Sequence, residues 1–418
     1  MRETMFRRAL LASAMTLGAA AVAAGGCGSD ASTSTTSTST TTTTAVTTGT
    51  GGSTSVTTGA GGEGGAGGQG GGAPTCLEAS AFATLFTLAQ PSLCAVAIYE
   101  ADAMIVQSFQ TPTWGAHGGP LTMKAIDGGE VTLERWSLPA GTSGKLTKVE
   151  TQVDAQIPAG AFAGSAAVDL PFYGWTAIDW SGAFPDTLGE VILIKGAKVE
   201  KRYPANGAFA LGGVASAAEK GRLLLTGLSA VGDPAAGANG LYAADTCGDA
   251  AMPSLLPGGN PACKAPIEVA AWGDSSGPIA VDHDGNVFAL TSSFSGDQEA
   301  RGFAAASIAA GAPASEGSKL FTLPGFGSAL AALAPKGAAK GLVAFQPFDG
   351  MTFAAEDVIG QAFSVAAGAI AAEGAPAPLI KPVTAGTALG LFTDDQERLW
   401  VAVPTAAGTT FVVLGRAP

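Results

Sequence analysis

The sequence has few charged residues and few histidines. Charged residues make up 13% of the 418-residue chain, about half the share usual in soluble domains. The only histidines are His117 and His283. A hydrolase triad needs a base held by a carboxylate and facing a nucleophile. We therefore expect no histidine-based hydrolase site, and the function we favour is binding rather than catalysis.

Basic residues are also scarce. There are 21 Lys and Arg against 34 Asp and Glu, which gives a formal net charge of −13 at pH 7. A surface of this sign repels phosphate groups, so it argues against nucleic-acid partners and against binding of anionic lipid headgroups. The simplest role of the surplus negative charge is to keep the protein soluble. We expect the protein to be a monomer.

Cysteine is limited to five residues, Cys27, Cys76, Cys94, Cys247 and Cys263. Leaving Cys27 aside, four cysteines permit three disulfide connectivities. Proximity in the sequence favours Cys76–Cys94 and Cys247–Cys263. Zinc is the rival interpretation, but neither pair has the Cys-x-x-Cys spacing and no histidine is near. The sequence therefore predicts no metal and no cofactor.

The N-terminus has the pattern of an export signal. Residues 1–8 are short and basic, residues 9–24 are apolar, and small residues precede Cys27. This arrangement resembles a bacterial lipobox, which implies a signal peptide over residues 1–26, lipid on Cys27 and a membrane anchor. An ordinary signal peptide cleaved nearby is the alternative. Gly28 follows the cysteine, and by resemblance to lipoprotein sorting this favours the outer membrane.

Residues 27–75 form a segment of different composition, rich first in Thr and Ser and then in Gly. Such a segment cannot bury enough apolar area to offset the chain entropy lost on folding. We predict a disordered tether here, followed by one folded domain over residues 76–418.

The folded part repeats a strand–turn–strand unit, shown most fully by GPIAVDHDGNVFAL at residues 277–290. Asp-Gly between two apolar runs is a strong hairpin signal, because Gly accepts a positive φ. The same unit recurs at residues 214–225 and 391–403. Four-stranded copies of about 40–50 residues are typical of β-propeller blades.

We assign six copies to the chain. Their innermost strands are rich in Ala and Gly, as expected where strands converge on an axis. We predict these strands near residues 93–99, 165–170, 212–217, 278–282, 329–334 and 387–392. The last copy lacks a fourth strand, and residues 83–88 read like the fourth strand at 319–323. The sequence therefore predicts an all-β, six-bladed β-propeller closed by pairing of residues 83–88 with residues 410–415. A β-sandwich or two β-domains is the competing architecture.

The repeated unit resembles six-bladed propellers of the NHL-repeat and gluconolactonase/regucalcin-like kind. Lactonase members of that group hold a divalent metal with Glu, Asn and Asp on their inner strands. The inner strands here, such as residues 329–334, offer no such set. The resemblance thus implies a fold, and no catalytic residue is carried over.

Carboxylates gather in the hairpins, at Asp282, Asp284, Asp394, Asp395 and Glu397. Asp-His-Asp-Gly-Asn is superficially like the start of a calcium loop, but it lacks the further oxygen ligands and the terminal Glu. Asp and Asn also stabilise turns through their own backbone. We predict that these residues are turn residues.

The remaining candidates lie in the loops between second and third strands and in the loops that lead into the inner strands. One face of a propeller carries both kinds of loop, and we predict ligand binding there. The candidate ligand-binding residues are Trp114, His117, Asp233, Asp274, Asp297, Arg301 and Asp349. The ligand could be a glycan, a small molecule or a protein. The alternative function is a propeller lactonase, lyase or glycan hydrolase with its site at the mouth of the channel.

Overall fold

The computed structural model describes part of the chain, all within the compact unit Ala73–Pro418. The described residues are 75–103, 112–115, 118–126, 130–154, 172–179, 186–195, 198–204, 209–216, 222–229, 240–245, 267–271, 276–292, 297–309, 317–324, 326–349, 352 and 354–417. The predicted signal peptide, Cys27 and nearly all of the predicted tether lie outside them. No helix among the described residues has the length and apolar character needed to span a bilayer.

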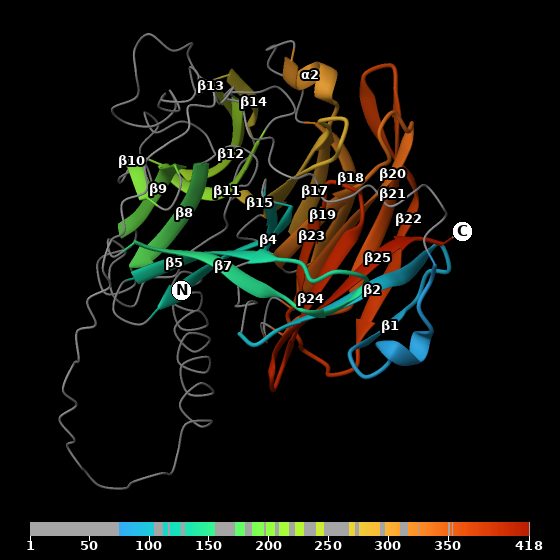
Figure 1. Cartoon of the computed structure of the whole chain (residues 1–418). Coiled ribbons are helices and arrows are strands. Elements are labelled where there is room, and N and C mark those ends of the chain that lie inside the picture. Colours follow the sequence, from blue (N-terminus) through green and yellow to red (C-terminus); the bar gives the residue numbers. More distant parts are fainter. Residues whose placement is uncertain are drawn as a thin grey trace, which may run out of the picture. The chain divides into compact units, whose positions relative to one another are not determined.

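The described strands form six sheets, each named here by its innermost strand (Figure 1). The β3 sheet consists of β3 (Thr113–Gly115), β4 (Gly119–Ile126), β5 (Glu130–Ser137) and β7 (Thr147–Asp154). The β8 sheet has β8 (Phe172–Asp179), β9 (Asp186–Lys195) and β10 (Lys198–Pro204). The β11 sheet has β11 (Phe209–Ser216), β12 (Arg222–Ser229), β13 (Gly240–Asp245) and β14 (Ile267–Ala271).

The other three sheets lie C-terminal to these. The β15 sheet has β15 (Ser276–Val281), β16 (Val287–Ser292), β17 (Asp297–Phe303) and β18 (Ser318–Pro324), with the helix α2 (Ala305–Ala309) between the last two. The β19 sheet has β19 (Phe326–Leu333), β20 (Lys340–Phe348), β21 (Val358–Ala366), β22 (Ala369–Pro382) and β1 (Phe86–Leu88). The β23 sheet has β23 (Gly390–Thr393), β24 (Leu399–Thr405), β25 (Gly408–Arg416), β2 (Leu93–Ala101) and β6 (Ser143–Lys145).

The sheets are arranged side by side through their innermost strands. Contacts run from β8 to β11, then to β15, β19, β23 and β3. Consecutive antiparallel sheets that meet at their first strands are the architecture of a β-propeller. The innermost strand β19 shows why small residues are needed there, because Ala329 and Ala331 are almost completely buried. The all-β propeller predicted from the repeats is confirmed.

The predicted closing strand is wrong, and a different N-terminal strand completes the last sheet. β2 pairs along its length with β25, whereas β1 pairs with β22 of the β19 sheet. Figure 1 shows these two blue strands beside red strands from the C-terminal part of the chain. β2 has nine residues and β1 only three, so β2 offers β25 a much longer hydrogen-bonded ladder. The likeness of residues 83–88 to residues 319–323 is that of two outermost strands.

Three further features differ from prediction. Residues 93–99, expected to be the innermost strand of the first copy, are β2, and β3 takes the inner position instead. Neither β3 nor β4 was predicted, because residues 113–120 were interpreted as a long loop and the next strand was expected at residues 131–138. In the β15 sheet the sequence pattern predicts a third strand at residues 302–308, but the strand is Asp297–Phe303, five residues earlier, and α2 follows it. The predicted inner strand at residues 165–170 lies outside the described residues.

Short strands cover two outermost edges. β1 pairs with β22, and β6 runs parallel to β2 with Ile98 opposite Ser143. Lys145 of β6 also pairs with Asp102, at 2.9 Å between Nζ and Oδ1. An open strand edge is a template for aggregation, so covering it is a common device in sheet proteins.

Candidate functional site

The strand ends define two faces of the propeller. The turn face carries the β15–β16, β19–β20 and β23–β24 turns, near residues 282–286, 334–339 and 394–398. The loop face lies at the opposite ends of the same strands, where β20 meets β21, β22 meets β23 and β24 meets β25. It is the face on which the sequence predicts ligand binding.

The structure describes four of the seven candidate ligand-binding residues, namely Trp114, Asp297, Arg301 and Asp349. Asp297 is the first residue of β17. Asp349 follows β20 on the loop face, where its Oδ1 accepts hydrogen bonds from the Thr352 backbone N–H at 2.6 Å and hydroxyl at 2.8 Å. This carboxylate stabilises its own loop. His117, Asp233 and Asp274 lie outside the described residues.

Trp114 contributes to the packing between two sheets. Its ring centroid lies 5.2 Å from that of Trp400, which is completely buried. Tyr99 and Phe392 stack on Trp400 at 5.5 and 5.6 Å. Aromatic pairs at such distances add stability beyond the apolar area they bury. Trp114 therefore stabilises the join between the β3 and β23 sheets.

Arg301 lies within β17, so its expected position in a loop is wrong. Its Nη2 pairs with Glu299, whose other carboxylate oxygen binds Lys319. Burial acts to raise the pKa of Glu299, but hydrogen bonds from Lys319 and Arg301 outweigh it, and the pKa is lowered overall. The side chain of Arg301 is only 13% exposed. It takes part in a strand-to-strand ion-pair network.

The hairpin carboxylates are turn residues, as the sequence predicts. Asp282 accepts hydrogen bonds from the backbone N–H groups of Asp284 and Asn286 and from the Asn286 amide. Asp394 does the same in the β23–β24 turn, with Gln396 and Arg398 as donors. Burial raises the pKa of Asp282, and the hydrogen bonds that Asp282 accepts from Asn286 and Asp284 offset this rise only in part. The described residues contain no group of three or more metal-ligating side chains.

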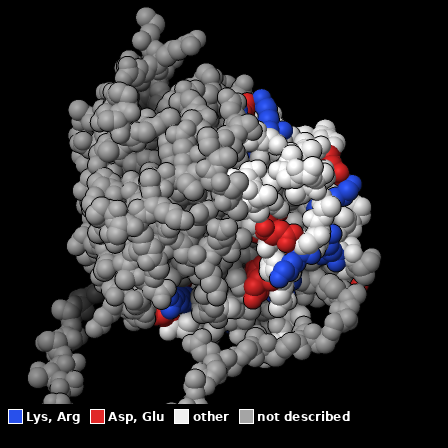
Figure 2. Space-filling model, turned by 90° about the horizontal axis from the view of Figure 1, so that it is seen from above, with Lys and Arg blue, Asp and Glu red and all other residues white. Residues whose placement is uncertain are grey.

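Carboxylates also connect the turns of neighbouring sheets. Asp284 accepts a hydrogen bond from the Gly337 N–H, and Glu397 accepts one from the Lys336 N–H at 2.6 Å. The β19–β20 turn is thus held from both sides. On the face shown in Figure 2, acidic and basic side chains of the described residues are interspersed. Four of the turn-face carboxylates are therefore engaged in structural contacts, namely Asp282, Asp284, Asp394 and Glu397.

Gly273-Asp-Ser-Ser-Gly277 fits the Gly-x-Ser-x-Gly pattern of a nucleophile elbow. An elbow places its serine on a sharp turn between a strand and a helix. Here Ser276 begins a strand, β15, and Ser275 lies outside the described residues. Among the described residues, the motif is thus followed by a strand and not by the helix that an elbow requires.

A pocket opens on the loop face where the β19 and β23 sheets meet. Its volume is about 440 Å³, within the range of small-molecule sites. The lining consists of uncharged residues from the β22–β23 loop, the end of β24 with its following turn, and the N-terminal segment: Thr84, Leu85, Thr384, Thr387, Val403, Pro404, Thr405 and Ala406. None of these side chains titrates near neutral pH, so the pocket provides hydroxyl groups and apolar surface.

Gln346 positions one wall of this pocket. It is completely buried in β20, and its Nε2 donates to the carbonyl oxygens of Glu356 and Thr387, both at 2.9 Å. Its Oε1 accepts from the Leu389 N–H at 2.7 Å. The amide thereby holds the loop that carries Thr387 against the β19 sheet. A buried amide with these partners is a rigid support.

The threonine hydroxyls have a defined polarity. Thr387 donates its hydroxyl proton to the Thr384 carbonyl at 2.7 Å, and Thr405 donates to the Gly408 carbonyl at 3.2 Å. A hydroxyl that donates in this way retains lone pairs that accept. The pocket is therefore suited to a ligand that presents O–H or N–H donors.

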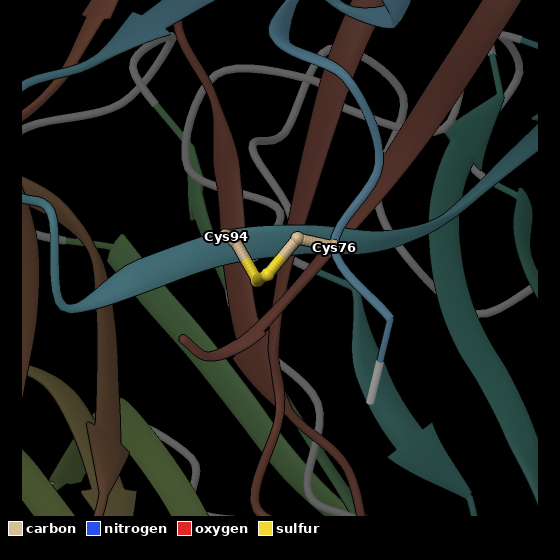
Figure 3. Close-up of a disulfide and its surroundings, with 2 residues drawn as sticks. All are labelled: Cys76 and Cys94. Atoms are coloured by element: carbon tan, nitrogen blue, oxygen red, sulfur yellow. A yellow bond between two sulfur atoms is a disulfide. The ribbon is translucent and has the colours of Figure 1, made fainter. Parts of the chain in front are cut away.

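The N-terminal segment forms the remaining wall, and we call residues 76–92 the strap. The Val383 N–H donates to the Leu85 carbonyl at 3.0 Å, beside the lining residues Thr84 and Thr384. The Cys76–Cys94 disulfide fastens the start of the strap to β2 (Figure 3), which confirms this predicted bridge. Cys247 and Cys263 lie outside the described residues.

Comparisons with known proteins give similarities of fold. No family model matches the chain, and no curated protein matches its sequence. The chain is similar to the PQQ-bound aldose sugar dehydrogenase of Streptomyces coelicolor, at 12% identity and a TM-score of 0.45, covering 77% of this chain and 97% of that one. Hydrazine synthase of Kuenenia stuttgartiensis gives 12% identity, a TM-score of 0.41, and coverages of 72% and 75%. The SapL1 lectin in complex with α-methyl fucoside gives 10% identity and a TM-score of 0.40, covering 76% of this chain and 97% of the lectin chain. These values are too low to transfer a ligand or a reaction.

The pocket lies on the face predicted to bind a ligand, but none of its lining residues is a predicted candidate. Thr384, Thr387 and Thr405 are common residues in loops, and no motif marks them. Thr84 and Leu85 were assigned to a closing strand of the last sheet. Only the docking of the strap on β22 brings these residues together.

Proposed function

We propose that the chain is a binding protein that captures an uncharged, hydroxyl-bearing ligand, such as a glycan unit, in the loop-face pocket. The observation that carries this proposal is the lining of the pocket, with four threonines, apolar side chains and no ionisable group. Acid–base and nucleophilic catalysis need ionisable or activated side chains at the reacting atoms. Hydrogen bonding and apolar contact are what this lining can supply.

The binding test uses calorimetric titration with methyl glycosides of glucose, galactose, mannose and N-acetylglucosamine. We expect at least one to bind, and Thr387→Val to weaken it about tenfold, as for the loss of one hydrogen bond. Thr322→Val, an exposed threonine on β18, is the matched control and should not alter affinity. Hydrolysis of a glycan or lactone by the purified chain, or equal affinity of the Thr387→Val protein, would contradict the proposal.

We also propose that this domain is tethered to the bacterial envelope. The support is the lipobox-like sequence before Cys27 and the long Thr/Ser- and Gly-rich segment that follows it. A lipid on Cys27 would anchor the chain in the membrane. Fractionation of producing cells tests this anchor. Cys27→Ser should shift the protein from the membrane to the soluble periplasmic fraction. Unchanged partitioning of the variant would refute the anchor.

We also propose that the propeller has six blades. Six sheets are described, and the contacts between their innermost strands form a consecutive series from β8 to β3. The series starts with the β8 sheet and ends with the β3 sheet. The outer strand β10 of the first sheet also contacts the outer strand β7 of the last. A ring of six blades accounts for both observations. An experimental structure with a seventh sheet between β7 and β10 would disprove it.

A further inference from the structure

The strap combines three features that the proposed binding function does not explain. It is closed into a loop by a disulfide with a sequence separation of 18. It adds a short strand to one sheet and continues directly into β2 of the next sheet. It also supplies Thr84 and Leu85 to the pocket. The pocket is complete only while the strap is docked.

The docked strap is held by apolar side chains and by a short backbone ladder, and its Leu77, Leu85 and Leu88 pack against the core. Phe82 and Phe86 are buried in the core shared by the β19 and β23 sheets. Two backbone hydrogen bonds flank the β1–β22 ladder, from Ala89 N–H to Leu379 and from Val383 N–H to Leu85. Segments held by such short ladders open more readily than the central strands of a sheet.

The disulfide sits where it limits this opening. Cys76 begins the strap and Cys94 is the second residue of β2, which is fixed by its ladder to β25. Leu77 N–H donates to the Ala95 carbonyl at 2.7 Å beside the bridge. With the bond intact both ends of the strap are fixed to β2. Without it, only the end that continues into β2 remains fixed.

We propose that the strap is a movable wall of the loop-face pocket and that the Cys76–Cys94 bond holds it closed. Both cysteines are partly exposed, so a dithiol reductant can reach the bond. Two electrons and two protons pass from the dithiol to the two sulfur atoms, the S–S bond breaks, and the reductant forms its own disulfide. Reduction of the bridge then favours the open pocket.

Ligand binding and strap closure are linked. A ligand that contacts Thr84 on the strap and Thr387 on the body binds the closed form better than the open one. It must therefore stabilise the closed strap by the same factor by which closure raises its affinity. This part of the inference rests on the proposed function, whereas the opening of the strap does not.

Hydrogen–deuterium exchange tests the opening without any ligand. Three full-length samples are compared: the oxidised protein, the protein treated with dithiothreitol, and the Cys76→Ser/Cys94→Ser variant. Amides of the strap and of Val383 should exchange about 100-fold faster in the last two, as expected for loss of a cross-link closing a loop of this length. The β2–β25 ladder should keep its protection in all three. Asp284→Asn, a change on the turn face, is the control and should leave the strap protected.

The methyl glycoside panel then tests the coupling. Any glycoside that binds the oxidised protein should bind the cysteine variant at least tenfold more weakly. Equal exchange of the strap in oxidised and disulfide-free protein would overturn the inference, whatever the panel shows. Equal affinity of a bound glycoside for both forms would overturn it too, while leaving the proposed function intact. If no glycoside binds, the proposed function fails and the exchange data alone decide on the movable wall.

Discussion

At the residue scale, one of three buried glutamines links two neighbouring sheets. Gln298, Gln346 and Gln361 are each 1% exposed or less. Burying an amide without hydrogen bonds costs several kcal/mol, and of these three only Gln346 has partners for both of its side-chain polar atoms. Gln346 has three backbone partners, and two of them, Thr387 and Leu389, belong to the segment leading into β23. It connects the β19 and β23 sheets at the pocket.

We expect Gln346→Leu to destabilise the fold by about 2–4 kcal/mol, because the Leu389 N–H and two carbonyls lose their partner while remaining buried. Urea denaturation followed by circular dichroism gives the free energy of unfolding. Gln396→Leu makes the same chemical change at an exposed turn position and should cost less than about 0.5 kcal/mol. Similar losses in both variants would show that Gln346 has no special structural role.

The Gln346→Leu variant should also bind glycosides more weakly in the calorimetric titration, because Gln346 holds the loop that carries the pocket residue Thr387.

At the scale of elements, the β19 sheet depends on close packing between neighbouring strands. Gly341 in β20 faces the ring of Phe363 in β21. A Cβ at Gly341 would lie 2.6 Å from the Leu333 carbonyl oxygen and closer still to the Phe363 ring. Phe363 is completely buried and packs on Phe288 of the neighbouring β15 sheet, at 4.6 Å between centroids. The absence of a side chain at Gly341 thus allows an aromatic contact between sheets.

Gly341→Ala should therefore destabilise the protein by about 1–3 kcal/mol, because the ring and the backbone must shift to accept one methyl group. Gly360→Ala, on the adjacent strand of the same sheet, is the matched control. Its added Cβ would come no closer than 3.1 Å, to a methyl group of Leu342 that can move. Thermal denaturation of both variants separates the two outcomes. A smaller loss at Gly341 than at Gly360 would contradict this account of the packing.

At the scale of the whole molecule, the N-terminal segment joins the two ends of the domain. Thr409 donates its hydroxyl proton to the Ala103 carbonyl across a sequence separation of 306 residues. β1 and β2 belong to different sheets, so one stretch of chain fastens the β19 sheet to the β23 sheet. Loss of β2 would expose the whole edge of β25.

Two N-terminal truncations should therefore behave differently. Removal of residues 1–92 deletes the strap and should leave a folded domain of lower stability, with a weakened pocket. Removal of residues 1–102 also deletes β2, and the exposed edge of β25 should cause aggregation. Size-exclusion chromatography and circular dichroism distinguish the two. A monomeric, folded protein after the longer truncation would show that β2 is not needed for closure.

The sequence alone determined the local structure of this protein. Asp-Gly between apolar runs predicted the β15–β16 hairpin, because turn conformation depends on residues adjacent in the chain. Small residues predicted the innermost strands β11, β15, β19 and β23 but not β3, and proximity predicted the Cys76–Cys94 bridge. Turn roles for Asp282 and Asp394 followed from the way Asp binds its own backbone.

Only the tertiary structure decided which distant strands pair and where a pocket forms. Backbone hydrogen bonds are the same for every strand, so the sequence of residues 83–88 could not show whether its partner is β25 or β22. That choice depends on the length of the available edge and on the burial of Phe82 and Phe86, to which remote residues contribute. The threonines of the pocket come from three separate segments. They become neighbours only after the sheets have packed, because nothing in their local sequence draws them together.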